Sequence, residues 1–406
     1  MTLGWAIITT GLHADVKIAP ALNATPEAEL VAVYSRDQGR AEAFAQKHGA
    51  KAAYSDLETL LHDPRVEVVF IASPNALHAT QTLAAARAGK HVLVEKPMAT
   101  TLDDAVAMVR ACREAGVKLG VGYHLRQHPG QRAVQRLITQ GVLGTVALAQ
   151  GQWGFGVRGQ DGPPVRTGLR QWWDDPDLIG GASTMMGTGV HVIDLLRFVL
   201  GQEVTEVAAL TDGQTAQRPL EQLVTMILRF DRGTLATMCC GRRLPDSRND
   251  LTVYGSLGRI TTRAALWEGR QGALEVVSET VHKSEVYPLT PLANFIDELA
   301  DFHHAIREDR EPAATGLDGL RVVQGDPGHD RVSQGRQDGQ ARAAGGVRIP
   351  LSAGRLLSTG TRRERHKGHA SPGLWAFSAM GVQVVFMAGG TDRRCVDLRS
   401  GDASGS

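Results

Sequence analysis

Apolar segments of strand length alternate with amphipathic segments along the first 126 residues of the chain. Runs rich in β-branched residues predict five strands, at Trp5–Thr9, Glu29–Ser35, Val66–Ser73, His91–Glu95 and Lys118–Tyr123. Apolar residues recur at helical spacing between them, over residues 40–48, 57–61, 76–88 and 102–115. Strands that alternate with helices form βαβ units with right-handed crossovers. Residues 1–126 are therefore expected to fold as a doubly wound parallel sheet, a Rossmann domain.

The pattern changes after about residue 145, where strand-like segments follow one another with turn residues between them. The segments are Val146–Trp153, Val204–Leu210, Leu223–Phe230, Thr234–Cys240, Leu251–Tyr254 and Arg259–Thr262. Consecutive strands of this kind predict an open, mostly antiparallel sheet. Helical patterns over residues 188–200 and 291–310 interrupt it. We therefore expect a second α/β domain over residues 127–324.

Beyond Gln324 the composition changes again. Residues 325–371 are rich in Gly, Arg, Gln, Asp and Ser, and such a segment cannot bury enough apolar surface to offset the entropy of ordering. A one-base shift of plausible codons for residues 325–332 restores an apolar helical pattern. We hypothesise that residues 325–406 are a frameshifted tail, with a disordered extension as the alternative, and the nucleotide sequence tests this.

The charge balance and the cysteine content exclude several classes of protein. The 406 residues include 44 basic and 43 acidic ones, so no strong field draws the chain to nucleic acid or to an anionic membrane. The 4 cysteines form no CxxC or Cys/His cluster, so no metal site is expected. Without a signal peptide or an apolar run of about 20 residues, the sequence predicts a cytoplasmic protein.

The first predicted strand leads into a turn of the kind that binds the pyrophosphate of a dinucleotide. Small residues in the pattern G-x-G-x-x-G/A let the backbone approach phosphate at a helix N-terminus. The turn has a glycine and an alanine in the second and third positions, but Thr9 replaces the first glycine. An ordinary strand–helix turn is the alternative. The candidate cofactor-binding residues are Thr9, Thr10, Gly11, Leu12 and Ala14.

Two further strand ends supply candidate cofactor contacts. Ser35 and Arg36 end the second strand, where an acid suits the ribose of NAD and an arginine suits the 2′-phosphate of NADP. Arg36 favours NADP, Asp37 keeps NAD open, and a solvated strand-end arginine is the alternative. At the end of the third strand, the candidate cofactor-binding residues are Ser73, Pro74, Asn75 and His78. The alternative interpretation of this segment is an ordinary helix start that is capped by Asn75.

The strongest signal is Glu95-Lys96-Pro97, directly after the fourth predicted strand. A lysine at this edge can hold a substrate oxygen and exchange a proton with it, and a surface lysine is the alternative. The segment resembles the signature of the glucose–fructose oxidoreductase / inositol dehydrogenase / MocA family, and the resemblance runs from Trp5 to about Gln324. Within that family, the sequence is similar to NADP-dependent 1,5-anhydrofructose reductases. The other matching segments are Ser73–His78, Ala88–Val92, Thr101–Ala105 and Tyr123–Arg126.

The resemblance implies a hydride transfer between NADP and a carbon of a sugar or polyol, catalysed by a homodimer or homotetramer. It implies that Lys96 is catalytic and lies, with Glu95, beside the cofactor. A second family motif matches residues 181–194, in which His191 binds the substrate or acts as acid or base, and Asp194 lies on the same helical face to orient it. Gly187 stands where many members have an acid, so either Lys96 and His191 suffice or catalysis is weakened.

Other residues of these segments are expected to line a sugar pocket. Aromatic faces pack on sugar C–H surfaces, while Arg and His supply hydrogen bonds. For Trp172 and Trp173, the alternative to sugar binding is a structural role at the junction between the domains. For His191, the alternative is a buried histidine of the core. A non-catalytic NADP-binding sensor and a glycoside-cleaving enzyme with a tightly held cofactor are the competing functions. The additional candidates are Tyr123, His124, Arg126, Trp172 and Trp173.

Overall fold

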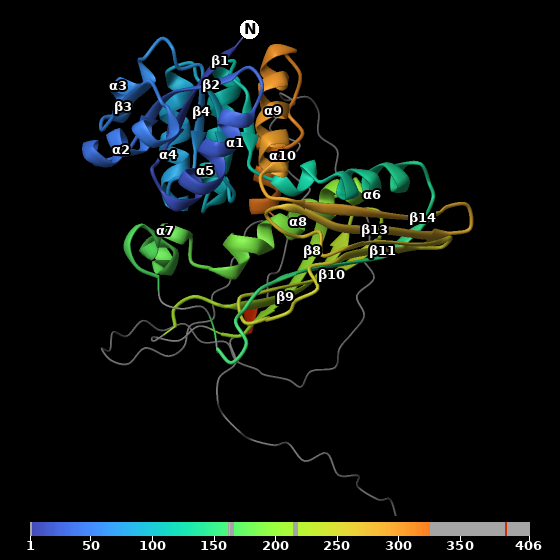
Figure 1. Cartoon of the computed structure of the whole chain (residues 1–406). Coiled ribbons are helices and arrows are strands. Elements are labelled where there is room, and N and C mark those ends of the chain that lie inside the picture. Colours follow the sequence, from blue (N-terminus) through green and yellow to red (C-terminus); the bar gives the residue numbers. More distant parts are fainter. Residues whose placement is uncertain (1, 161, 163–165, 214–217, 325–385, 388–406) are drawn as a thin grey trace, which may run out of the picture. The chain divides into compact units, whose positions relative to one another are not determined.

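The computed structural model of the chain describes residues 2–160, 162, 166–213, 218–324 and 386–387 (Figure 1). All of them belong to one unit of the chain, residues 1–327 with 376–406, and the other unit, residues 328–375, lies outside the described residues. The predicted tail therefore lies outside them too, apart from Phe386–Met387. Among the helices of the described residues, none is both long and apolar enough to cross a membrane.

The first half of the chain forms a six-stranded parallel sheet, as its alternating pattern predicts. The strands are β1 (Leu3–Ile8), β2 (Ala28–Tyr34), β3 (Ala52–Tyr54), β4 (Val68–Ile71), β5 (His91–Val94) and β6 (Leu119–Val121). Their order is β3-β2-β1-β4-β5-β6, and all neighbours are parallel. A doubly wound sheet of this order has its ligand crevice where the order reverses, between β1 and β4.

Helices cover both faces of this sheet because the central strand β1 is apolar on both sides (Figure 1). Trp5 and Ile7 pack in one core cluster, and Ala6 and Ile8 pack in another. Helices α1 (Ala19–Ala24) and α2 (Gln38–His48) contribute to the first cluster. Helices α3 (Leu57–Leu61), α4 (His78–Arg87) and α5 (Leu102–Glu114) contribute to the second.

Helix α9 (Ala293–Arg307) comes late in the sequence but packs on the parallel sheet. Phe295, Leu299 and Phe302 lie on one helical face and join the core around Trp5. The rings of Phe302 and Trp5 meet edge-on, with centroids 6.0 Å apart. The predicted division of the chain between residues 126 and 127 stays a prediction.

The second sheet has nine strands and is mostly antiparallel, as the consecutive strand pattern predicts. Its order is β14-β13-β12-β11-β7-β10-β9-β8-β15, and only the pairs β7–β10 and β8–β15 are parallel among the described strands. The strands are β7 (Val146–Gly154), β8 (Val204–Thr211), β9 (Leu223–Phe230), β10 (Leu235–Gly241), β11 (Leu251–Gly255), β12 (Gly258–Arg263), β13 (Arg270–Ser278), β14 (His282–Thr290) and β15 (Phe386–Met387).

One face of the second sheet keeps large apolar residues exposed. Residues alternate between buried and exposed along β9, and Ile227 is 55% exposed. Leu210, Leu235 and Tyr254 share this face through the strand pairing and are also exposed. Buried helix α8 (Val190–Leu200) packs against β7, α6 (Pro129–Thr139) and α10 (Gly316–Gln324).

Candidate functional site

A cavity of about 430 Å³ lies at the carboxyl ends of the parallel strands, within the range of roughly 300–1,000 Å³ typical of small-molecule sites. Parallel strands end at one sheet edge, so residues distant in sequence meet there. The predicted residues that line it are Gly11, Leu12, Ser73, Asn75, His78, Glu95, Lys96, His124, Trp172, Trp173 and His191. The predicted residues outside its lining are Thr9, Thr10, Ala14, Ser35, Arg36, Pro74, Tyr123, Arg126 and Asp194.

The turn after β1 forms despite the threonine in place of its first glycine. Thr9 has φ +145°, a region that favours glycine, and its hydroxyl accepts a hydrogen bond from Gly11 N at 3.1 Å. A Cβ on Gly11 would meet only Thr9 Oγ1, at 3.4 Å, so the backbone here is open. The helical segment η1 (Ala14–Ile18) and α1 follow at once. The turn therefore presents open backbone at a helix start, where an anion is stabilised.

The residues at the end of β2 differ in their surroundings. Buried Ser35 accepts a hydrogen bond from Thr10 Oγ1 at 3.2 Å, which joins this strand end to the first turn. Asp37 caps α2 by accepting from Arg40 N at 2.8 Å. Arg36 is exposed and makes no hydrogen bond or ion pair with any residue that the structure describes. The arginine, rather than the acid, is therefore available to a ligand.

The turn after β4 is held by the neighbouring segments. Asn75 Nδ2 donates to Ile179 O at 2.9 Å instead of capping its own helical turn. The ring nitrogens of His78 lie 2.9 Å from Ser73 O and 2.8 Å from Pro97 O. Burial lowers the pKa of His78. His78 thus connects the turn after β4 with the turn after β5 and holds in place the segment that carries Lys96.

Glu95 is a buried carboxylate at the end of β5. Its Oε1 lies 2.9 Å from His13 Nε2, and its Oε2 accepts a hydrogen bond from Lys96 N at 3.2 Å. Burial alone would raise the pKa of Glu95, but the charge and hydrogen bond of His13, with Lys96 and His124, lower it to about 2. Glu95 therefore stays ionised at neutral pH. His13 belongs to the first turn but was not among the predicted site residues.

Lys96 reaches from the end of β5 to the segment before α8. Its Nζ donates to Gly187 O at 3.2 Å and lies 5.9 Å from the ring centroid of Trp173. Gly187 belongs to η5 (Met185–Gly189) and lies about one helical turn before His191. The ammonium is therefore held beside the start of α8 by a backbone carbonyl, since Gly187 has no side chain to offer.

Two histidines line the cavity as buried, neutral rings. His191 is 2% exposed, and burial, with a smaller effect of Lys96, lowers its pKa well below 6.5. Burial also lowers the pKa of His124 to about 4. The two ring centroids are 4.8 Å apart. Within the described residues, His191 Nδ1 and His124 Nε2 are buried and have no hydrogen-bond partner.

Arg126 and Asp194 form a buried ion pair behind the cavity. Arg126 Nε donates to Asp194 Oδ2 at 2.8 Å, and its Nη2 donates to Asp194 Oδ1 at 2.6 Å. Asp194 thus bonds with Arg126 rather than with His191, which differs from the expected orienting role. Tyr123 is 1% exposed, and its ring meets that of His191 with centroids 5.9 Å apart. Of these residues, Tyr123 packs directly against the histidine.

Aromatic and basic side chains form the wall opposite the parallel sheet. Trp172 and Trp173, in η4 (Gly168–Asp174), have centroids 4.5 Å apart and planes 30° apart. Arg166 forms an ion pair with Asp174 and lies over the Trp173 ring, 5.6 Å from its centroid. The lining residues that sequence reasoning missed include Trp153, Arg166, Arg170, Arg242 and Trp267. Trp153 lies in β7 and Arg170 in η4, while the other three lie in connecting segments, and none of the five belongs to a motif that could have revealed it.

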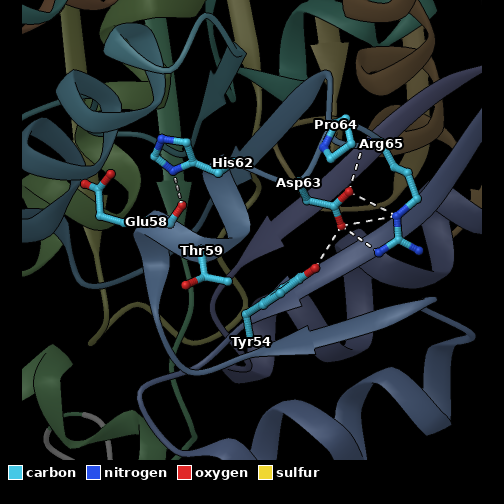
Figure 2. A pocket seen from close by; sticks show the side chains of 7 residues that line it. All are labelled: Tyr54, Glu58, Thr59, His62, Asp63, Pro64 and Arg65. Carbon is cyan, nitrogen blue, oxygen red and sulfur yellow. Dashed lines mark hydrogen bonds and ion pairs between the residues drawn. The ribbon is translucent and has the colours of Figure 1, made fainter.

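A second hollow, of about 500 Å³, lies on the parallel-sheet domain near β3 and α3 (Figure 2). Asp63 accepts hydrogen bonds there from Tyr54 Oη at 2.9 Å and from Arg65 Nη2 at 2.6 Å. The bond with Arg65 holds the pKa of Asp63 well below its usual value. Because these charged groups satisfy one another, we do not place the functional site in this hollow.

The cavity at the carboxyl ends of the parallel strands fits a nicotinamide dinucleotide better than a metal ion. In the described part of the chain, no group of three or more His, Cys, Asp or Glu residues could hold a metal. Open backbone at Gly11 faces the crevice between β1 and β4, and the rings of His124 and His191 line the same cavity. The dinucleotide would be held by the first turn, by Ser35 and Arg36, and by residues 73–78.

Two family models match the chain: "Oxidoreductase family, NAD-binding Rossmann fold" over residues 3–123, and "GFO/IDH/MocA C-terminal domain" over residues 131–261. The chain is 33% identical over 317 residues to a 1,5-anhydro-D-fructose reductase from Ensifer adhaerens, covering 78% of this chain and 92% of that protein. It is 29% identical over 307 residues to D-xylose 1-dehydrogenase (NADP(+)) 2 from Haloferax volcanii, and the match covers 75% of this chain and 90% of that protein. The structure is also similar to the crystal structure of an aldose-aldose oxidoreductase from Caulobacter crescentus in complex with glycerol, with a TM-score of 0.70 and 27% sequence identity. This match covers 80% of this chain and 95% of the other.

Proposed function

The chain belongs to the GFO/IDH/MocA oxidoreductase family, and we propose that it transfers a hydride between NADP and a carbon of a sugar or polyol. The observation that carries this proposal is that Lys96 and His191 line the same cavity as the turn after β1. The nicotinamide, when bound, supplies or accepts the hydride, and the protein supplies position and charge. The names of the Ensifer and Haloferax relatives support a sugar as substrate.

The side chains have distinct roles in this proposal. The Lys96 ammonium donates a proton to the carbonyl oxygen during reduction, and the Lys96 amine accepts it during oxidation. His191 lines the cavity as a neutral ring, and its imidazole orients a substrate hydroxyl. Glu95 is ionised and offsets the positive charge of Lys96. The stacked Trp172 and Trp173 give the sugar an apolar surface and exclude water.

The direct test is consumption of NADPH by the full chain with a panel of sugar ketones and aldehydes. Turnover with at least one sugar would support the proposal. A folded protein that binds NADPH but turns over no sugar would favour the sensor. Glycoside hydrolysis without net consumption of NADPH would favour the glycosidase.

Replacing Arg36 with alanine should separate the two cofactors. Arg36 is exposed and unpaired among the described residues, so we propose that its guanidinium binds the 2′-phosphate of NADP. Loss of a charge-assisted hydrogen bond costs about 1.5–3 kcal/mol, so KM for NADPH should rise about 10–100-fold. KM for NADH should change less than about twofold, as should both values in the control Arg40→Ala. Equal losses for the two cofactors would contradict the assignment.

The rate should be flat through the pH range in which an exposed histidine titrates. Burial holds the pKa of His191 well below 6.5, so its ring stays neutral from about pH 6.5 to 8. We expect kcat/KM to fall on the acid side only below this range. His191→Asn keeps a hydrogen-bonding side chain and should lower kcat about 10–100-fold. A wild-type inflection near 6.5 that disappears in this variant would show that His191 titrates like an exposed histidine.

A homodimer or homotetramer stays a prediction. The exposed Leu210, Ile227, Leu235 and Tyr254 on one face of the second sheet support it, since large apolar patches mark interaction surfaces. A cytoplasmic location also stays a prediction.

A further inference from the structure

The positive charge at the substrate end of the cavity is not balanced. Arg170 and Arg242 line the cavity, and neither forms an ion pair with a carboxylate among the described residues. The carboxylates in the lining, Glu95 and Glu268, are already engaged near the first turn. Glu95 contacts His13, and Glu268 pairs with Lys17 of η1 at 3.0 Å.

Arg242 is held in place by neutral groups. Its Nη1 donates to Ser183 Oγ at 2.9 Å, and its guanidinium carbon lies 5.7 Å from the ring centroid of Phe155. Glu221 in turn fixes the Ser183 segment, because its Oε2 accepts from Ser183 N at 2.7 Å and its Oε1 from Met185 N at 2.8 Å. Arg242 Nε is buried without an acceptor in the described structure. The guanidinium is therefore positioned, charged and largely unsatisfied.

The other basic groups of this wall differ from Arg242. Arg166 has its charge matched by Asp174 and stiffens the Trp173 ring. Arg170 is exposed on η4 beside the tryptophan pair. Gly187, which accepts the hydrogen bond of Lys96, contributes no side chain, although a Cβ there would meet only Trp173, at 3.7 Å. No carboxylate of the lining therefore offsets Arg242 and Arg170.

We infer that the cavity takes a sugar or polyol that carries an anionic group, a carboxylate or a phosphate, which Arg242 binds together with Arg170. A guanidinium presents parallel N–H groups that match the oxygens of both anions. The anion would be held at the wall formed by η4 and the Ser183 segment, while Lys96 contacts the oxygen of the reacting carbon. This inference rests on the proposed hydride transfer and specifies its substrate class.

The test compares matched substrates in the full chain with NADPH or NADP. Each neutral sugar is paired with its uronic acid and with its phosphate ester, and kcat/KM is measured for all three. We expect at least one anionic form to exceed the neutral form by about tenfold or more, as charge complementarity gives specificity. The uronic-acid and phosphate arms decide which anion is preferred. Equal or better turnover of the neutral sugar would overturn the inference and leave the proposed function standing, whereas no turnover of any sugar would contradict the proposed function itself.

Arg242→Gln should lower the ratio of anionic to neutral kcat/KM about 10–100-fold, because it removes one charge-assisted contact. The matched control is Arg243→Gln, since Arg243 pairs with Asp212 and does not line the cavity. It should leave the ratio unchanged. Arg170→Gln alters an exposed side chain and should also lower the ratio. This variant therefore replaces Arg242→Gln as the test if Arg242→Gln does not fold. An unchanged ratio in a folded Arg242→Gln, or in Arg170→Gln when that variant is needed, would refute the inference.

Discussion

Lys96→Met should lower kcat for sugar reduction by about 10²–10⁴-fold, the usual contribution of a positioned proton donor. Methionine keeps an unbranched apolar side chain of similar length but removes the ammonium that donates to Gly187 O at 3.2 Å and lies 5.9 Å from the Trp173 ring centroid. The loss should fall mainly on kcat, because the lysine acts on the reacting oxygen rather than on the rest of the sugar. NADPH absorbance at saturating sugar gives kcat, and fluorescence titration gives the affinity for NADPH.

The matched control for this substitution is Lys47→Met. Lys47 is exposed on α2 and pairs with Asp15 at 2.7 Å, away from the cavity lining. We expect its kcat to stay within about twofold of wild type, because exposed ion pairs contribute about 0–1 kcal/mol. A folded Lys96→Met enzyme that keeps more than about a tenth of the wild-type kcat would remove Lys96 from the chemistry.

The parallel sheet could be predicted because its strands are continuous apolar runs. Such strands are buried on both faces, and the predicted and observed bounds of β1, β2 and β5 differ by only a few residues. Strand β3 was missed because its three residues, Ala52–Tyr54, are too short to show a pattern. Strand β14 was missed because most of its residues are exposed and polar, as on the edge of a sheet.

The strand ends of the predicted parallel sheet indicated many residues of the site, but the sequence did not predict the wall of aromatic and basic side chains opposite that sheet. Residues at strand ends, such as Asn75 and Lys96, meet in the cavity because the topology of a parallel sheet brings strand ends together. His191 was found only through the family motif, since a histidine in an apolar helix resembles a core residue. Arg242 follows β10 with no local signal, and its importance depends on the lack of a carboxylate nearby in three dimensions.

Removal of one partner of the buried Arg126–Asp194 ion pair should lower the free energy of unfolding more than removal of one partner of an ion pair at the surface. Arg126→Met is expected to lower the free energy of unfolding by about 3–5 kcal/mol, because it leaves the buried Asp194 without its bidentate partner. Arg126 also donates to Ala313 O at 2.6 Å and lies 3.0 Å from Asp318 Oδ1, so it links the segment after β6 with α8 and α10. Urea unfolding of the full chain gives this free energy.

The pH dependence and a double variant test the cause of that loss. Burial already raises the pKa of Asp194, and removal of Arg126 should raise it further, so the cost of the buried charge grows as pH rises through that pKa. The deficit of Arg126→Met should therefore be larger at about pH 8 than at about pH 5, and Arg126→Met with Asp194→Asn should recover most of it at the higher pH. The exposed pair of Arg229 and Glu206 is the control, since Arg229→Met should cost less than about 1 kcal/mol. An Arg126→Met deficit that is equally large at both pH values and unchanged in the double variant would show that packing of the arginine, not its charge, supports the wall behind His191.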